Sequence, residues 1–300
     1  MTFTITEPGL FVDVPPKEYH ADPCPVPSLS SSIAKVIVDQ SPAHAKQQHV
    51  RLTPQEPKKP STDRDIGSAC HALIFGGEAI EVVDADGWTK KADQVTRAQA
   101  YAEGRIPLIT AHYDRAVAMA NIARPMIVER LGDDFLPEAV IAWQEGSAWC
   151  RTALDGVSRD LTRWVDLKTS GAECDATASV KRFYSESHDI QCGFQSRGLD
   201  AIDKPGIGRR QCWFLYIEND APFGCTPVRI TEAMMTFARR KAFVATGLWR
   251  TSMSLGQWPN YPTADVTPEM PAWAEQSWMR REQEDAAVKR IVEEFGTSIK

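Results

Sequence analysis

The clearest hydrophobic pattern in the chain begins soon after residue 60. Apolar residues recur there at intervals of three and four positions, the spacing of one buried helix face: Ile66, Ala69, Cys70, Leu73 and Ile74. Asp63 or Asp65 can cap the first turn, and the glycines that follow residue 75 can end the last one. We therefore expect a helix with His71 at the edge of its buried face. Gly67 lies one turn earlier on the same side, so that nothing bulky covers the imidazole from that direction.

Alternating apolar and polar residues, the pattern of half-buried strands, occupy the middle of the chain. The expected strands are residues 138–143, 148–157, 161–167, 212–217 and 228–230. Further helices are expected from the serine run at 28–32 to about residue 41 and at residues 92–104, 110–131, 175–201 and 232–250. This order of elements predicts a single α/β domain with a central mixed β-sheet flanked by helices.

The two ends of the chain differ from this α/β region. Residues 1–28 are rich in proline and are expected to form an extended N-terminal arm, followed by the main domain at residues 29–260. Residues 261–300 are expected to hold an irregular segment and a charged C-terminal helix at about residues 273–295.

Composition limits the class of protein. The 300 residues carry a net charge of −6, which does not favour a protein that coats nucleic acid by charge alone. The seven cysteines are odd in number and form no C-x-x-C pair, which disfavours a disulfide framework, a zinc knuckle and an iron–sulfur cluster. Because no long apolar run and no secretory leader occur, we expect a cytoplasmic protein with reduced thiols and no membrane contact.

The turn at residues 158–160 decides whether two carboxylates meet. A two-residue loop pairs Asp155 with Trp164, and a four-residue loop places Asp155 opposite Asp166. Both registers put the two carboxylates and Lys168 on one face, whereas a three-residue loop separates them. Two acids and a lysine on one face of an otherwise apolar hairpin are costly to desolvate unless a bound cation compensates them.

The residue types define the kind of cation. Carboxylate oxygens with at most one imidazole suit Mg²⁺, or Mn²⁺ as a substitute, better than zinc. We therefore expect His71, Asp155 and Asp166 to bind one or two divalent cations. Such a cation can stabilise the charge that develops in phosphodiester hydrolysis and lower the pKa of an attacking water. Lys168 can orient or help to deprotonate that water, or neutralise the transition state.

The spacing of these residues resembles a known nuclease signature. Asp155 and the sequence Asp-Leu-Lys-Thr at residues 166–169 are separated by ten residues, which resembles the D…(D/E)-x-K pattern of the PD-(D/E)XK nucleases, in the form used by their RecB-like branch. Residues 67–71 are similar to that branch's G-x-x-x-H helix. The metal ligands expected on these grounds are His71, Asp155, Asp166 and the backbone carbonyl of Leu167, and the expected catalytic residues are Asp155, Asp166, Lys168 and Gln191.

Gln191 and Glu138 are further candidates for the site, and each can also be interpreted in another way. Gln191 matches the glutamine of the branch's Q-x-x-x-Y motif, but Gln195 stands where that motif has tyrosine. This departure puts the motif's role in DNA contact or active-site support in doubt. Glu138, at the start of a strand, is a candidate ligand of a second metal or of a metal-bound water, and the alternative is a solvated side chain.

The closest resemblance is to the RecE-type exonuclease domain of phages and prophages, over about residues 19–260. The matching features, in similar order, are residues 19–21, the serine-rich helix start, residues 41–43, residues 67–71, Glu138 with Trp143, residues 150–151, Asp155, residues 166–169 and Gln191. This resemblance implies magnesium-dependent digestion of linear double-stranded DNA from the 5′ end. It also implies a ring-shaped homo-oligomer and a single-strand annealing protein as partner in phage-type recombination.

Each of these residues also has a purely structural interpretation. His71 can be a hydrogen-bonded histidine at a helix edge, and Asp155 can cap a turn before the following glycine. Asp166 and Lys168 can form an ion pair on an exposed strand, which stabilises little. Gln191 can be a surface glutamine.

Basic and aromatic residues elsewhere are weaker candidates. Phosphate contacts are conceivable in the basic runs at residues 209–210, 239–241 and 280–281, although charge runs are more often solvated. Trp273, Trp278 and Met279 are expected to pack the tail onto the main domain or a neighbouring subunit. Three functions stay open: an exonuclease, a non-catalytic or weakly active DNA-end binding subunit on the same fold, and a metal hydrolase or structural domain unrelated to nucleic acid.

Overall fold

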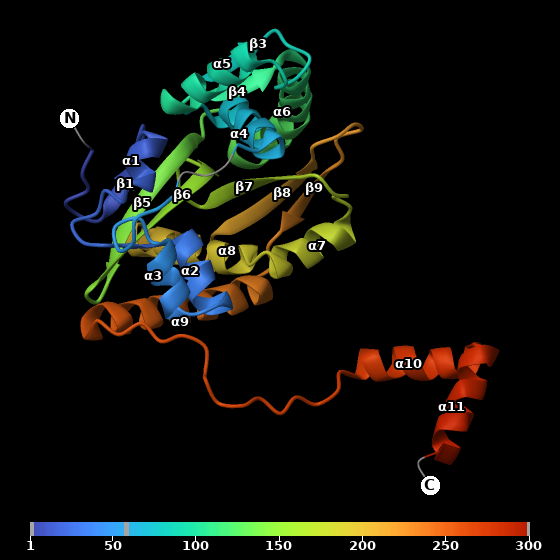
Figure 1. Ribbon diagram of the computed structural model, residues 1–300. Coiled ribbons are helices and arrows are strands. Elements are labelled where there is room, and N and C mark those ends of the chain that lie inside the picture. The colour runs from blue at the N-terminus through green and yellow to red at the C-terminus, as the bar shows by residue number, and fades with distance from the viewer. Residues whose placement is uncertain (1–2, 57–59, 299–300) are drawn as a thin grey trace. The chain divides into compact units, whose positions relative to one another are not determined.

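The computed structural model describes residues 3–56 and 60–298 (Figure 1). The chain forms two compact units, Met1–Asn260 and Tyr261–Lys300. The smaller unit holds α10 (Ala272–Glu284) and α11 (Ala286–Ser298). The single charged helix expected at residues 273–295 is therefore two helices, because Asp285 between them has extended backbone angles, φ −99° and ψ 105°.

A mixed β-sheet forms the centre of the larger unit. In the described part of the chain seven strands take part, in the order β1–β5–β6–β7–β8–β9, with β2 paired to β6 as well. The strands are β1 (Gly9–Phe11), β2 (Leu29–Ser30), β5 (Leu136–Glu145), β6 (Ala148–Val157), β7 (Arg163–Ser170), β8 (Gln211–Glu218) and β9 (Cys225–Arg229). The β7–β8 and β2–β6 pairs are parallel and the other pairs antiparallel.

Helices cover both faces of this sheet (Figure 1). One face carries α4 (Thr62–Phe75) and α6 (Thr110–Leu131), and the other carries α2 (Ser31–Asp39), α8 (His188–Ile202) and α9 (Glu232–Leu255). Val165 of β7 points into the core beneath α4 and α6, and Trp164 points into the core on the α8 side. The predicted α/β class, with a mixed sheet flanked by helices, is confirmed. Because side chains alternate along β7, Asp166 lies on the α8 side of the sheet.

Two short strands outside the main sheet were not predicted from the sequence. β3 (Ile80–Val83) and β4 (Ile106–Ile109) form a separate parallel pair, joined through α5 (Lys91–Ala102). All four residues of β4 are buried. Such a strand has no alternation of apolar and polar residues, so the two-residue period that identifies a half-buried strand is missing.

Residues 3–28 are folded onto the sheet and are not simply extended. β1 pairs with β5, and α1 (Pro16–His20) is a short helix. Arg151 on β6 holds this segment, because its Nη1 lies 2.9 Å from Oδ1 of Asp22 and its guanidinium lies over the ring of Tyr19, 5.5 Å from the centroid. This anchor places α1 beside β6.

Local backbone conformation also corrects two helix predictions. The helix expected at residues 175–201 is two helices, α7 (Ala176–Ser185) and α8, because Ser187 has a left-handed φ of 55°. The N-cap of α4 is Ser61, and neither Asp63 nor Asp65 caps it, since both lie in the first turn. Asp65 instead accepts a hydrogen bond of 2.8 Å from Nη2 of Arg97 on α5. The remaining helices are α3 (Pro42–Gln48) and the short 3₁₀ turn η1 (Lys204–Gly206).

The lengths of the helices and the state of the cysteines bear on the class of protein. Within the described ranges, no helix is both long and apolar enough to cross a lipid bilayer. These ranges include all seven cysteines, and each is a free thiol. One pair of sulfurs lies close together in the core, with Sγ of Cys192 3.8 Å from Sγ of Cys212.

Candidate active site

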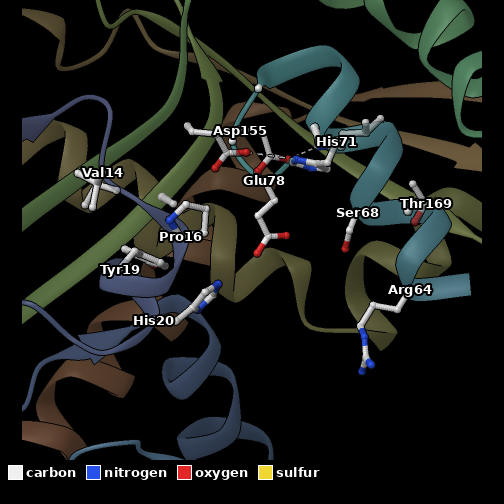
Figure 2. A pocket seen from close by; sticks show the side chains of 18 residues that line it. Val14, Pro16, Tyr19, His20, Arg64, Ser68, His71, Glu78, Asp155 and Thr169 are labelled. Atoms are coloured by element: carbon white, nitrogen blue, oxygen red, sulfur yellow. Dashed lines mark hydrogen bonds and ion pairs between the residues drawn. The ribbon is translucent and has the colours of Figure 1, made fainter. Parts of the chain in front are cut away.

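A cleft of about 430 Å³ opens between α1, α4 and the strands that carry the predicted carboxylates. Figure 2 shows Tyr19 and His20 of α1 on one side and Arg64 and Ser68 of α4 on the other. The side chains of His71 and Asp155 meet at the inner end of the cleft.

His71 contacts two carboxylates at once. Its Nε2 lies 2.9 Å from Oδ2 of Asp155 on β6, and its Nδ1 lies 3.3 Å from Oε1 of Glu138 on β5. Burial alone would lower the pKa of His71, but the negative charges of Asp155 and Glu138 and their hydrogen bonds outweigh it and raise the pKa to about 10. This end of the cleft therefore favours a positive charge at the imidazole.

The pairing between β5 and β6 is interrupted at Glu138 and Asp155. In the ladder between β5 and β6, Pro137 pairs with Gly156, and the next pair is Ala139 with Leu154. Glu138 and Asp155, which lie between these two pairs, are not paired with each other. Glu138 has a φ of 46°, in the left-handed region that non-glycine residues rarely adopt. Such strain persists only where surrounding contacts enforce it and is frequent at functional sites. The interrupted ladder lets both carboxylates reach His71.

Asp155 also replaces a backbone partner between β6 and β7. The observed pairs, Gly156 with Val165 and Val157 with Trp164, have the register predicted for a four-residue loop. The ladder ends before Asp155, whose Oδ2 accepts a hydrogen bond of 2.7 Å from the backbone N–H of Leu167. Burial would raise the pKa of Asp155, but the charges of His71 and Lys168 and this N–H lower it, so the group is ionised.

Gly67 has a further role that the sequence analysis did not predict. A Cβ atom at this position would lie 2.5 Å from Oγ1 of Thr169, which is closer than any real contact. The side chain of Thr169 thus fills the space beside the glycine. Gly67 is needed because α4 lies so close to β7 there, which brings His71 within reach of Asp155.

Asp166 lies on the α8 side of the sheet and is fully buried. Its Oδ2 accepts hydrogen bonds from Nε2 of Gln191 at 2.5 Å and Nε2 of Gln195 at 3.0 Å. Its Oδ1 lies 2.5 Å from Nζ of Lys168. Burial and the charge of Asp155 raise the pKa of Asp166, and the ammonium of Lys168 opposes that shift. In this ion pair Asp166 is buried and Lys168 is half-buried, so the alternative of an exposed surface pair is wrong.

Gln195 proves to be part of this site. Besides Asp166, its side chain binds the core: Oε1 accepts a hydrogen bond of 3.1 Å from Nε1 of Trp164. The tyrosine of the resembled motif is thus replaced by a second amide that holds the carboxylate. The sequence could have indicated this role, because Gln191 and Gln195 are four residues apart and therefore share one face of α8.

Lys168 is positively charged in this arrangement. Burial would lower its pKa, but the charges of Asp166 and Asp155 outweigh burial and raise the pKa above its ordinary value. A lysine that holds its proton so firmly is a poor base. Among the roles predicted for Lys168, neutralising negative charge therefore fits the geometry best.

Glu78 is a site residue that the sequence analysis missed. It lines the cleft, and its carboxylate extends into the middle of the cleft (Figure 2). Burial and the nearby Glu138 raise its pKa. Glu78 lies in the loop after α4, where Gly76 and Gly77 have φ angles of 83° and 102°. No periodic pattern extends into this loop, so nothing in the sequence could mark the residue.

The donor set is compatible with a divalent cation, although it is not assembled around one point. In the parts of the chain that the structure covers, no group of three or more His, Cys, Asp or Glu side chains is arranged to hold a metal ion. The separation of 2.9 Å between His71 Nε2 and Asp155 Oδ2 nevertheless matches neighbouring ligands of an octahedral Mg²⁺, about 3 Å apart for bonds of about 2.1 Å. In addition, Oδ1 of Asp166 is buried and accepts no hydrogen bond of good geometry from the described residues, despite the nearby ammonium. The chemistry of these donors thus fits a cation with His71 and Asp155 as adjacent ligands.

Three of the seven basic residues predicted as phosphate contacts form ion pairs with acidic residues of α8. Nε of Arg210 lies 2.8 Å from Oδ1 of Asp200, Arg239 pairs with the same carboxylate, and Nζ of Lys241 lies 2.6 Å from Oδ2 of Asp189. These three basic residues hold α8 to its neighbours. Arg209 and Arg240 are exposed, as are Arg280 and Arg281 in the smaller unit. In that unit Trp273, Trp278 and Met279 are also exposed, at 74%, 50% and 50%.

Comparison with known proteins supports the fold. The structure is similar to that of a protein from Eubacterium rectale described as a candidate exonuclease, with a TM-score of 0.53 and 12% identity over 84% of this chain and 93% of that chain. An alkaline exonuclease from Laribacter hongkongensis overlaps over 63% of this chain and 89% of that chain, with 13% identity and a TM-score of only 0.28. No protein-family model matches the sequence, and no curated protein matches it significantly. At such low identity the first likeness shows a shared fold alone.

Proposed function

We propose that this protein is a metal-dependent exonuclease that hydrolyses the phosphodiester bonds of linear double-stranded DNA. One observation carries the proposal: the Asp166–Lys168 pair, whose carboxylate is buried, and the His71–Asp155 pair lie where β6 and β7 separate. Residues of nuclease-like spacing from both pairs thus lie on adjacent strands, and the His71–Asp155 pair lines an open cleft. Such a convergence is what phosphodiester hydrolysis requires, and a chance likeness in the motifs would not produce it.

The chain's own residues suit this chemistry. Mg²⁺, with Mn²⁺ as a substitute, would be held by His71, Asp155 and Asp166, together with the Leu167 carbonyl and Glu138, and would stabilise the negative charge of the transition state. The backbone N–H of Leu167 orients Asp155, and the two amides of Gln191 and Gln195 orient Asp166. Lys168 supplies a fixed positive charge on the α8 side. The cleft lined by Arg64 and His20 is the approach for a strand end.

The finer features of the proposal come from the resemblance to the RecE-type exonuclease domain. They are digestion from the 5′ to the 3′ end, a ring-shaped homo-oligomer, and action beside a single-strand annealing protein in phage-type recombination in the cytoplasm. The E. rectale protein of similar fold is itself described as a candidate exonuclease, which agrees with the class of activity proposed.

A second candidate function is a non-catalytic subunit that binds DNA ends. It is favoured by one observation, the lack of a three-ligand metal group among the described side chains. In that case His71 would itself be the cation that neutralises Asp155 and Glu138, consistent with its raised pKa.

Digestion of linear and closed circular duplex DNA, in Mg²⁺ and in EDTA, separates the two functions. The exonuclease proposal predicts loss of linear DNA only, abolished by EDTA, by Asp166→Ala and by Lys168→Ala. Matched surface controls are Asp84→Ala and Lys91→Ala, because both side chains are exposed, and both should act like the unaltered protein. End binding without digestion would support the second function. If DNA is neither bound nor cut, both proposals fail.

A further inference from the structure

A second, smaller cavity of about 190 Å³ borders Asp155 from the side of α2. Its lining includes Ser31, Ser32 and Lys35 of α2, together with Asp155 and Gln191. Because Asp155 and Tyr19 line both cavities, the site can be approached from two sides. The larger cleft carries the acidic groups around His71, and the smaller one carries hydroxyl groups and a lysine.

Lys35 is an unusual lysine. It is half-buried, and among the described residues it forms no hydrogen bond and no ion pair within 4 Å. Burial, followed by the like charge of Lys168, lowers its pKa to about 8, and the charge of Asp166 opposes this. Lys168 is held by Asp166, whereas the ammonium of Lys35 is still available to an anion.

A partly buried ammonium without a partner destabilises a folded protein unless a ligand compensates it. A ligand of the Lys35 ammonium would be anionic, because an ammonium pairs with negative charge. The group that enters the cavity must also be small, because the cavity holds about 190 Å³, and both Lys35 and Ser32 line it. A phosphodiester group of the DNA backbone has these properties.

We propose that Lys35 contacts the phosphate that is hydrolysed and binds one of its non-bridging oxygens from the α2 side. This inference rests on the proposed nuclease function and adds a second lysine to its site. The two lysines then stand on the same side of the carboxylates as Gln191, and the cation ligand His71 stands on the other. Charge that accumulates on the phosphate in the transition state is stabilised by Lys35 directly, without any covalent change in the lysine.

A purely structural lysine would behave differently from this one. Lys35→Met removes a charge that has no partner and keeps the length of the side chain. The free energy of unfolding should therefore stay the same or rise, while activity falls. A structural role predicts a parallel loss of stability and activity.

The test measures cleavage and DNA binding for the unaltered full chain, Lys35→Met, Lys35→Arg and the exposed control Lys91→Met. The substrates are linear duplexes with either an ordinary or a neutral methylphosphonate linkage at the bond to be cut. We expect Lys35→Met to lower kcat by about 10²-fold or more. It should also reduce the slope of log Kd against log salt concentration in EDTA by about one. Lys35→Arg should retain more activity than Lys35→Met.

The methylphosphonate assigns the contact to one phosphate. It should weaken binding to the unaltered chain and to Lys91→Met, and it should have little further effect on Lys35→Met. If Lys35→Met keeps the kcat, the salt slope and the methylphosphonate penalty of the unaltered chain, the inference about Lys35 is wrong and the nuclease proposal stands. If the unaltered chain itself neither binds nor cuts the ordinary duplex, the nuclease proposal fails and the inference fails with it.

Discussion

Nε2 of His71 and Oδ2 of Asp155 lie 2.9 Å apart, although one residue belongs to a helix and the other to a strand of the main sheet. The contact exists because the ladder between β5 and β6 is interrupted and because Gly67 allows α4 to approach β7. It gives the imidazole two neighbouring carboxylates and a strongly raised pKa. A proton on His71 and a bound cation are thus alternative ways to neutralise the same charges.

Removal of the His71 imidazole should lower both the stability of the protein and its response to metal. Without metal, His71→Ala leaves Asp155 and Glu138 uncompensated, and the free energy of unfolding should fall by about 1–3 kcal/mol. Mn²⁺ should raise the melting temperature of the unaltered protein and raise that of His71→Ala much less, because one ligand is missing. Calorimetry in EDTA and in Mn²⁺ measures both effects. An equal Mn²⁺ response in the two proteins would exclude His71 as a ligand.

Close packing at Gly67 predicts a specific rescue. Gly67→Ala places a Cβ atom 2.5 Å from Oγ1 of Thr169, so it should destabilise the protein by about 1–3 kcal/mol despite alanine's better helix propensity. Adding Thr169→Ala removes the clashing atom, and the double variant should recover most of that loss. Urea denaturation of the two single variants and the double variant gives the coupling energy. Strict additivity would show that the clash is relieved in another way.

Gln195 should matter for stability as well as for the site. Gln195→Leu leaves Nε1 of Trp164 without its acceptor and removes one of two amide donors to Asp166. Each lost partner of a buried polar group costs about 1–3 kcal/mol. The exposed Gln48→Leu, on α3, serves as control and should change the free energy of unfolding by less than about 0.5 kcal/mol. Similar urea midpoints for the two variants would contradict the hydrogen bonds described.

The buried His188 predicts how stability depends on pH. Its Nδ1 lies 2.8 Å from the hydroxyl of Tyr216. Burial, together with the positive charges of Lys168, Lys35 and Arg182, lowers its pKa to about 2. The folded state therefore binds no proton there between about pH 2 and pH 6.5, whereas the unfolded state does. This contribution to stability is fully present above about pH 7 and is lost as the pH falls.

Denaturation at several pH values checks this sign. Between pH 7 and pH 5 the neutral His188 should account for a loss of about 2 kcal/mol in the free energy of unfolding. His188→Gln does not titrate and retains a polar group for Tyr216, so its stability should fall less over the same range. Only the difference between the two proteins is decisive, because other groups titrate as well. If the free energy of unfolding falls equally with pH in both proteins, His188 is protonated in the folded protein. Glu186, whose Oε2 lies 3.6 Å from Nε2 of His188, could stabilise that charge.

Much of the fold could be inferred from local patterns. The period of the apolar residues identified α4, and alternation identified β5, β6 and β7, because each pattern depends only on which face of one element is buried. The two-acid hairpin followed in the same way, with the four-residue register among the alternatives considered. The patterns failed where burial is uniform, as in β4, or where one residue breaks a helix, as Ser187 does.

The site itself depends on contacts between elements that are distant in the sequence. Residue types and spacing identified Asp155, Asp166 and Lys168, since these residues lie on adjacent strands joined by one short turn. The orientation of Glu138, the second amide from Gln195, and the positions of Glu78 and Lys35 follow from how α4, α8 and α2 pack on the two faces of the sheet. A one-dimensional pattern records the buried face of each helix, but not the distance and angle at which that face meets the strands. Those two quantities determine which polar side chains share a cavity, and only the packed sheet and helices define them.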